Sequence, residues 1–238
     1  MKIDHRRKYG IMLDTETANG LECPLFYDLG WQVIDTKGNV YVSRSFVNRD
    51  IYIGERELMK SAYYAEKIPN YARDIREGSR VLADIWTIYR TFREDCEKYG
   101  CEFVVAHNAR FDYKAVNGTM RYITKSQYRY FIPYNLEWWD TLRMAREVVA
   151  NKPTYIAFCN ENGYTQSNGK PRLTAEILYR YITGDKDFIE SHTGLEDVEI
   201  ERQIFSYCMR QHQKMEKRLF LPKEGEERPT AQMVIYYR

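Results

Sequence analysis

The sequence lacks the features of a disulfide-rich, zinc-binding or membrane protein. Its five cysteines are odd in number and none are paired at C-x-x-C spacing, which argues against a disulfide framework and a zinc site. We expect reduced, mostly buried thiols in a cytoplasmic protein. The opening segment MKIDHRRKYG has no apolar core, and no run of 18 apolar residues exists. Neither a signal peptide, a transmembrane helix nor membrane association is therefore expected.

The sequence also has little net charge. The formal value is +2 for 238 residues, so the field of the whole molecule does not attract a polyanion. If the partner is nucleic acid, local basic patches or bound metal ions must supply the attraction. The hydrophobic content of 44% is sufficient for a sizeable core.

The order of apolar patterns predicts an α/β fold with a mixed sheet flanked by helices. We expect strands over 9–14, 25–35, 39–47, 102–106 and 135–139. We expect helices over 84–99, 110–124, 141–150, 173–182 and 194–217, with further helical stretches within 48–80. Thr36-Lys37-Gly38 joins two strands as a hairpin, which gives the sheet a three-stranded antiparallel start.

The first candidate site segment is Asp14-Thr15-Glu16-Thr17. Residues two apart in a strand point to the same face, so Asp14 and Glu16 lie side by side at the end of the first strand. Carboxylates this close resist joint ionisation, and a bound divalent cation removes that penalty. Taken alone, such a pair is common and more often marks an exposed strand end.

The second segment, His107-Asn108-Ala109-Arg110-Phe111-Asp112, follows the strand 102–106. It places the third acid, Asp112, in the first turn of a helix. Taken alone, an acid at this position more often complements the helix dipole.

The third segment is His192-Thr193-Gly194-Leu195-Glu196-Asp197, in which Thr193 and Glu196 have capping-box spacing. With Thr193 as N-cap, His192 and Asp197 occupy the two positions that a hydrophobic staple joins. The cap therefore predicts an imidazole beside a carboxylate. A surface contact between them without a role is the alternative.

Together the three segments resemble the ExoI, ExoII and ExoIII motifs of the DEDD exonucleases. Within that superfamily they resemble the DEDDh branch, the DnaQ-like family that includes proofreading subunits. The sequences LDTET, VVAHNARFDYKAV and HTGLED correspond to its D-x-E-T, H-N-A-x-F-D and H-x-x-x-x-D. The resemblance covers roughly 9–212. It departs at Gly194, where the family commonly has alanine, and the glycine is expected to loosen the helix start slightly.

The resemblance implies a ribonuclease-H-like fold and a metal-dependent 3′→5′ exonuclease that releases nucleoside 5′-monophosphates, preferably from single-stranded DNA. It implies that Asp14, Glu16, Asp112 and Asp197 hold two Mg²⁺ or Mn²⁺ ions. His192 is implied as the general base, and its ordinary pKa of about 6.5 suits that role. The substrate is implied to contact Thr15, Thr17, His107, Asn108 and Phe111. For Asn108 and Phe111, a helix-start hydrogen bond and a core ring are equally consistent.

Three alternatives remain open at this point. The motifs do not separate DNA from RNA, so an exoribonuclease that trims RNA 3′ ends is one. A catalytically silent nucleic-acid-binding or polymerase-docking module is another, although all five motif residues are present. A proofreader associated with a polymerase or replication protein is the third. We expect an exonuclease domain over residues 1–218 and a tail over 219–238, which adds an edge strand or docks a partner.

Overall fold

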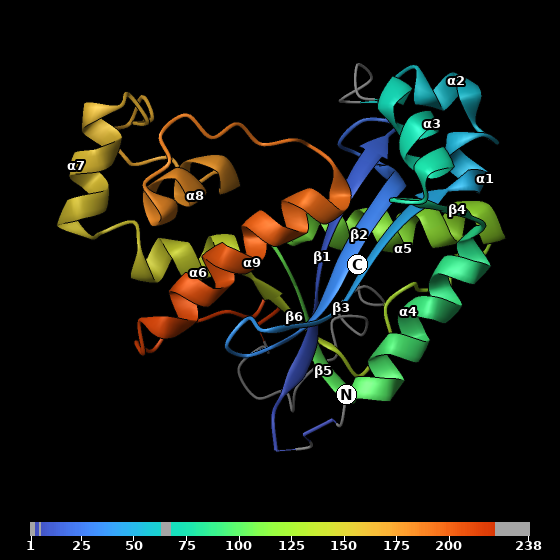
Figure 1. Ribbon diagram of the computed structural model, residues 1–238, viewed down its shortest axis with the longest axis horizontal. Coiled ribbons are helices and arrows are strands. Elements are labelled where there is room, and N and C mark those ends of the chain that lie inside the picture. Colours follow the sequence, from blue (N-terminus) through green and yellow to red (C-terminus); the bar gives the residue numbers. More distant parts are fainter. Residues whose placement is uncertain (1–2, 5, 63–67, 222–238) are drawn as a thin grey trace.

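In the part of the chain that the structure describes, the sheet has six strands in the order β4-β3-β2-β1-β5-β6 (Figure 1). A computed structural model describes residues 3–4, 6–62 and 68–221. The strands are β1 (Tyr9–Ala18), β2 (Leu25–Asp35), β3 (Val40–Asn48), β4 (Val81–Ala83), β5 (Cys101–Ala106) and β6 (Glu137–Asp140). β1, β2 and β3 pair antiparallel, whereas β4, β5 and β6 each join a neighbour in parallel. The predicted mixed sheet with an antiparallel start is confirmed.

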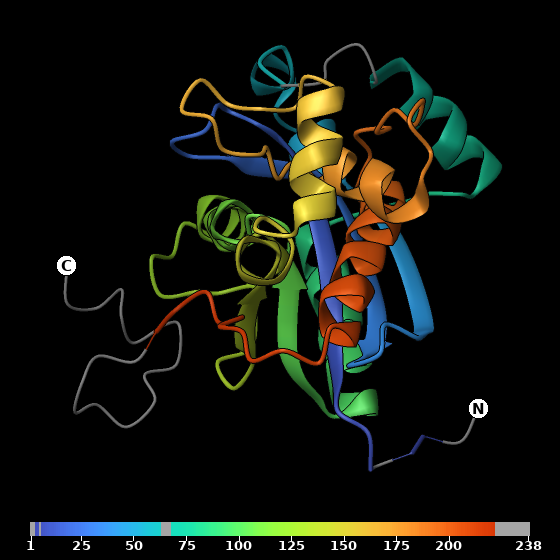
Figure 2. The same ribbon diagram turned by 90° about the vertical axis from the view of Figure 1, so that its left-hand side faces the viewer.

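Helices cover both faces of this sheet (Figures 1 and 2). They are α1 (Arg49–Tyr52), α2 (Arg56–Met59), α3 (Ile68–Glu77), α4 (Ile85–Tyr99), α5 (Arg110–Thr124), α6 (Thr141–Val148), α7 (Pro153–Glu161), α8 (Ala175–Thr183) and α9 (Gly194–Arg210). The helices α4, α5 and α6 were all predicted, and for α4 and α6 the prediction succeeds because the caps are local. Asp84 and Asp140 accept backbone hydrogen bonds at the helix starts, and Gly100 ends α4 in the left-handed conformation.

The alternation of side chains along β1 separates two apolar cores. Ile11 and Leu13 pack with α4 and α5 on one face of the sheet. Met12, between them, packs with α6, α7, α8 and α9 on the other face. This period of two continues along the strand, so Asp14 and Glu16 are directed to the face that α9 covers, where α9 packs across β1 and β2.

The first strand is longer than the sequence predicts. It continues to Ala18, so Asp14 lies within the strand and not at its end. The run Asp14–Thr17 is polar, and polarity is why the expected strand stopped there. Thr15, Glu16 and Thr17 are nevertheless all buried, and they pair with β2 across a register shift between Glu16 and Thr17.

Other differences concern short or polar segments. β4 and α7 were not expected, and α9 ends at Arg210 where a helix to 217 was predicted. After α9 the chain returns to the edge of β6. There the Asp140 N–H donates to the Lys217 carbonyl at 2.8 Å, and the Leu219 N–H donates to the Trp138 carbonyl at 2.7 Å. These bonds explain why residues 217–219 are extended and not helical.

The predicted tail falls almost wholly outside the described residues, because only 219–221 of 219–238 are included. Its role as an edge strand or docking segment therefore stays a prediction, as does the domain boundary at 218. All five cysteines are free and four of them are buried, as expected. Within the described ranges, no helix combines the length and apolar character that crossing a bilayer requires.

Candidate active site

The two acids of β1 face the start of α9. Glu16 is 6% exposed, and Asp14 is half-buried. Among the described residues, the buried Oδ2 atom of Asp14 has no hydrogen-bond partner. A buried carboxylate oxygen without a donor is costly, and a bound cation would satisfy it. This atom is the first structural sign that the cluster fits a metal ion.

Asp112 lies in the first turn of α5, as predicted, and is 2% exposed. It accepts a hydrogen bond from Thr15 Oγ1 at 2.8 Å, which ties the start of α5 to β1. The preceding turn depends on Asn108, whose φ of 60° is left-handed. The Asn108 N–H donates to Asp140 Oδ1 at 3.0 Å, so the end of β6 fixes the same turn.

The start of α9 is capped differently from the predicted capping box. Thr193 is the N-cap, but its side chain makes no cap hydrogen bond. The Thr193 N–H donates instead to Asp197 Oδ2 at 3.0 Å. Glu196, which was expected to accept that bond, pairs with Arg80 at 2.8 Å. An ion pair from a distant segment has therefore displaced the local pattern, and Asp197 caps its own helix.

The contact that positions this helix start requires glycine. A Cβ atom on Gly194 would lie 2.8 Å from the backbone nitrogen of Gly30 in β2, closer than such atoms approach. The Gly194 N–H donates to Asp28 Oδ2 at 3.0 Å. Gly194 thus permits close packing of α9 on β2, a role different from the looser helix start expected from the sequence.

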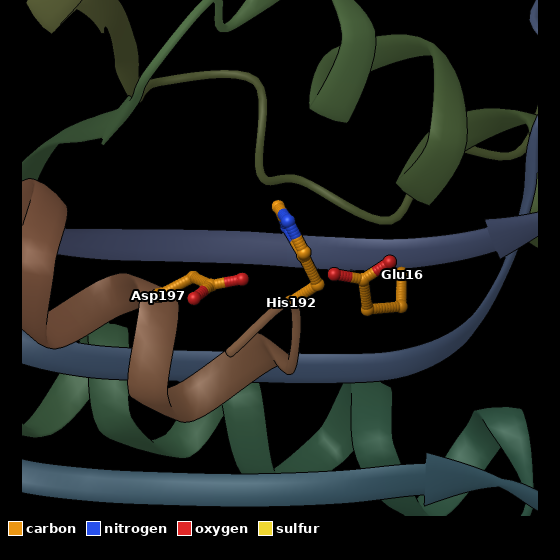
Figure 3. A group of neighbouring side chains, drawn as sticks. All are labelled: Glu16, His192 and Asp197. Carbon is orange, nitrogen blue, oxygen red and sulfur yellow. The ribbon is translucent and has the colours of Figure 1, made fainter. Parts of the chain in front are cut away.

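Glu16, His192 and Asp197 form a cluster that can hold a metal ion. Each offers one ligand atom, and these atoms all lie within 4.8 Å of one another. Figure 3 shows Glu16 projecting from β1 toward the segment that carries the other two side chains. His192 has a left-handed φ of 54°, and its Nδ1 lies 3.9 Å from Glu190 Oε2. The predicted contact of His192 with Asp197 is thus part of a larger group.

Burial and mutual repulsion raise the pKa values of these acids. Burial, followed by the charge of Asp197, raises the pKa of Glu16 to about 9. Burial, followed by Glu190, raises the pKa of Asp197 to about 8. Burial raises the pKa of Asp112 to about 7 against the hydrogen bond from Thr15. Burial raises the pKa of Asp14 well above its usual range. The charges of neighbouring acids, of which Glu201 contributes most, act in the same direction. Divalent cations would reverse these shifts, and carboxylate oxygens suit hard ions such as Mg²⁺ or Mn²⁺.

Sequence reasoning missed one further acid, Glu201. It lies one helical turn after Asp197, is 4% exposed, and accepts a hydrogen bond from the His107 N–H at 3.0 Å. Burial, followed by the charge of Asp112, raises the pKa of Glu201 well above its usual range. The spacing of four residues from Asp197 places both side chains on one helix face, and that spacing was the available signal.

The structure separates the proposed substrate contacts into two groups. Thr15 and Thr17 are buried beside the acids, and the Thr15 hydroxyl is engaged with Asp112. Asn108 is exposed and Phe111 half-buried at the start of α5. These four substrate roles stay predictions.

His107 differs from the other candidates because both of its ring nitrogens have protein partners. Nδ1 lies 2.9 Å from Thr141 Oγ1, and Nε2 lies 2.9 Å from the Leu173 carbonyl. Burial lowers the pKa of this imidazole, so the neutral ring is favoured. These contacts favour a positioning role for His107.

The fold of this protein is similar to those of several solved structures. No protein-family model matches the chain, and no curated protein matches it by sequence. A full-length 3′-exonuclease superposes with a TM-score of 0.58 at 11% identity, covering 94% of this chain and 95% of that one. A 3′-exonuclease that recognises the 3′ end of a histone mRNA stem-loop gives a TM-score of 0.52 at 11% identity, covering 89% and 66%.

E. coli exonuclease I, bound to an oligonucleotide, gives a TM-score of 0.51 at 13% identity, covering 87% of this chain. This chain spans 41% of that protein and slightly less than two thirds of the histone mRNA exonuclease. At these identities the similarity establishes architecture. The mixed six-stranded sheet with helices on both faces is therefore the ribonuclease-H-like fold of the 3′-exonucleases, as the sequence motifs predicted.

Proposed function

We propose that this protein is a metal-dependent 3′→5′ exonuclease that releases nucleoside 5′-monophosphates from the 3′ end of DNA, with single strands preferred. One observation carries the proposal. Acids from three distant segments, Asp14 and Glu16, Asp112, and Asp197, meet beside the imidazole of His192 on a fold shared with 3′-exonucleases. The structural neighbours include proteins bound to DNA and to RNA, so RNA remains the second substrate to test.

The proposed roles follow from the donor set. Asp14, Glu16, Asp112 and Asp197 would hold two divalent ions, Mg²⁺ or Mn²⁺. When bound, such ions neutralise charge that develops on the phosphate and the leaving oxygen. The imidazole of His192 accepts the proton of the attacking water. Asp112 is fixed for its role by Thr15, and Asp197 by the N–H of Thr193.

A degradation assay with labelled oligonucleotides tests this proposal. Single- and double-stranded DNA and RNA, carrying a 5′ label, are incubated with the protein and Mg²⁺, and products are resolved by length. A ladder that shortens from the 3′ end is expected, and the Asp14→Asn variant should give none. A circular single strand and a strand with a 3′ phosphate should both resist. Cutting of the circle would show an endonuclease, and full activity of Asp14→Asn would refute the site.

A further inference from the structure

One face of α5 carries a line of cations that the proposed chemistry does not use. Successive residues of a helix turn by about 100°, so Arg110, Lys114 and Arg121 fall within about 40° of one another around the axis. Lys125 directly follows the helix as its C-cap residue. Arg110, Lys114 and Lys125 are exposed and Arg121 is half-buried. The opposite side of the helix is apolar and packs against the sheet. The cations therefore form one stripe along the outward face of α5.

No acidic residue close in the sequence offsets the positive charge of this stripe. Residues 113–136 contain no aspartate or glutamate, although the whole chain is only +2. Asp112, the acid just before this range, is buried on the inner side of the helix. Among the residues that the structure describes, none of the four cations takes part in an ion pair. This surface therefore carries a local excess of positive charge, with the Glu55 carboxylate, which accepts from Tyr122, at its far end.

The far end of the stripe continues into a group of aromatic rings beside cations. The Lys125 ammonium lies 4.2 Å from the centre of the Tyr122 ring. The next exposed cation, Arg129, lies 5.0 Å over Trp86 at the start of α4, and that ring is 40% exposed. Tyr128 between them is 63% exposed. Exposed rings interleaved with cations are the surface on which bases stack while phosphates are neutralised.

The near end of the stripe lies in the first turn of α5, the turn that carries Asp112. Arg110 is two residues before Asp112, whose carboxylate is held against β1 by Thr15. The 15 residues of α5 span about 22 Å at the usual rise. Figure 1 shows the helix crossing one side of the sheet toward α1 and α4. The hydrogen bond from Tyr122 to Glu55 at 2.8 Å fixes that far end beside the α1–α2 segment. The stripe thus leads from the acids to the aromatic group.

We infer that the outward face of α5, together with Tyr128, Arg129 and Trp86, binds the sugar–phosphate backbone and bases of a single strand whose 3′ end lies in the site. This inference rests on the proposed function and adds the path of the strand. Lys114, Lys125 and Arg129 contact phosphates, and the rings of Trp86 and Tyr128 stack on bases.

Salt-dependent binding tests the path. A fluorescent 12-nucleotide DNA is titrated into protein carrying Asp14→Asn, at several salt concentrations. The triple variant Lys114→Gln, Lys125→Gln, Arg129→Gln should bind about tenfold or more weakly, and its log–log salt slope should be smaller by about 2, since each lost single-strand phosphate contact contributes about 0.7. Arg110 is kept because it borders the site, and Arg121 because it packs at 4.3 Å over Tyr130.

The matched control removes three exposed cations from other surfaces: Lys37→Gln, Arg76→Gln and Lys98→Gln. It changes the net charge equally and should keep the wild-type salt slope. If both triple variants lose the same affinity and slope, general charge and not the α5 stripe binds the strand, and the inference is wrong.

Activity against substrates of two lengths separates this inference from the proposed function. The α5 triple variant should lose about ten times more kcat/KM on a 12-nucleotide strand than on a dinucleotide, because a dinucleotide does not reach the stripe. If the variant loses the same kcat/KM on both lengths, the proposed strand path is wrong. Degradation of both substrates by the wild-type protein would still support the exonuclease activity. If the wild-type protein degrades neither substrate, the proposed function itself fails.

Discussion

Asp28 accepts the backbone N–H of Gly194 at 3.0 Å, and this bond joins the interior of β2 to the first residue of α9. The carboxylate is fully buried and also receives Tyr71 Oη at 2.8 Å and Arg80 Nη1 at 2.9 Å. Arg80 reaches onward to Glu196 in the first turn of α9. A buried ionic network thus holds the helix that carries Asp197, although none of its members belongs to the sequence motif positions proposed for catalysis.

The Gly194→Ala substitution should disturb this contact. The added methyl group meets backbone atoms of Gly30 that cannot move aside as a side chain can. We expect a loss of about 1–3 kcal/mol in the free energy of unfolding and a lower nuclease rate, because Asp197 shifts with the helix. Thermal or urea unfolding and the oligonucleotide assay measure the two effects.

The control for that variant is Gly118→Ala in α5. Its added methyl group would make only ordinary contact, 3.5 Å from the Pro24 carbonyl. Replacing a glycine inside a helix should then raise stability by about 0.5–1 kcal/mol. A Gly194→Ala protein that is as stable and active as wild type would show that the β2–α9 contact tolerates a side chain.

Stability of the metal-free protein should fall as pH rises. The pKa of Glu16 is about 9 in the folded protein against an ordinary value of 4.5, and that of Asp197 is about 8 against 3.8. At a pH between the ordinary pKa and the folded-state pKa of each acid, the folded state keeps a proton that the unfolded chain has released. The free energy of unfolding therefore decreases as pH rises through this range. Unfolding in EDTA at pH 5 and pH 8 measures the trend, and Glu16→Gln should flatten it.

Added Mg²⁺ should reduce the same pH dependence, because a bound cation favours the ionised carboxylates. Stability in EDTA that stays constant or rises from pH 5 to pH 8, in both wild type and Glu16→Gln, would contradict the repulsive cluster.

His192 and Asp197 should differ in what their loss removes. His192→Ala should slow single-turnover cleavage by about 10²- to 10⁴-fold, the range for a general base, and spare metal affinity. Asp197→Ala should lose both. Calorimetric titration with Mn²⁺ beside rapid-mixing kinetics gives the comparison. The His192 nitrogen lies close enough to Glu16 and Asp197 to be a ligand. If the two variants lose metal affinity equally, His192 is a metal ligand.

Glu201 should act by positioning the turn before α5. Glu201→Gln keeps an oxygen acceptor for the His107 N–H, whereas Glu201→Leu leaves that N–H without its partner. We expect the leucine variant to lose about 1–3 kcal/mol of stability and much of its kcat, with the glutamine variant close to wild type in both. If glutamine is as damaging as leucine and also weakens metal binding, Glu201 acts through its charge and belongs with the ligands.

Local sequence patterns predicted the parts of the fold whose structure depends on residues close together in the chain. The hairpin around Gly38 and the helix starts at Asp84 and Asp140 follow from nearby caps and turns. The side-by-side placement of Asp14 and Glu16 follows from the period of a strand. The convergence of three distant segments was predicted only through the family resemblance, since no local rule brings residues 14, 112 and 197 together.

The failures occur where tertiary contacts override the local pattern. Polar residues after Asp14 suggested a strand end, but they are buried because they line the candidate site. Arg80 draws Glu196 away from the helix cap, and Asp197 takes its place. Glu201 resembles a solvent-exposed helix acid in the sequence. Its spacing from Asp197 was the one local signal, and its packing against the His107 turn shows that it is buried.

The placement of α9 also determines when the site forms during synthesis. Asp14, Glu16 and Asp112 leave the ribosome well before His192 and Asp197, which lie at the start of the last helix described. A nascent chain that has already paired β1, β2 and β5 still lacks one side of the metal cluster. The cluster of Glu16, His192 and Asp197 is therefore complete only after α9 has docked on β1 and β2.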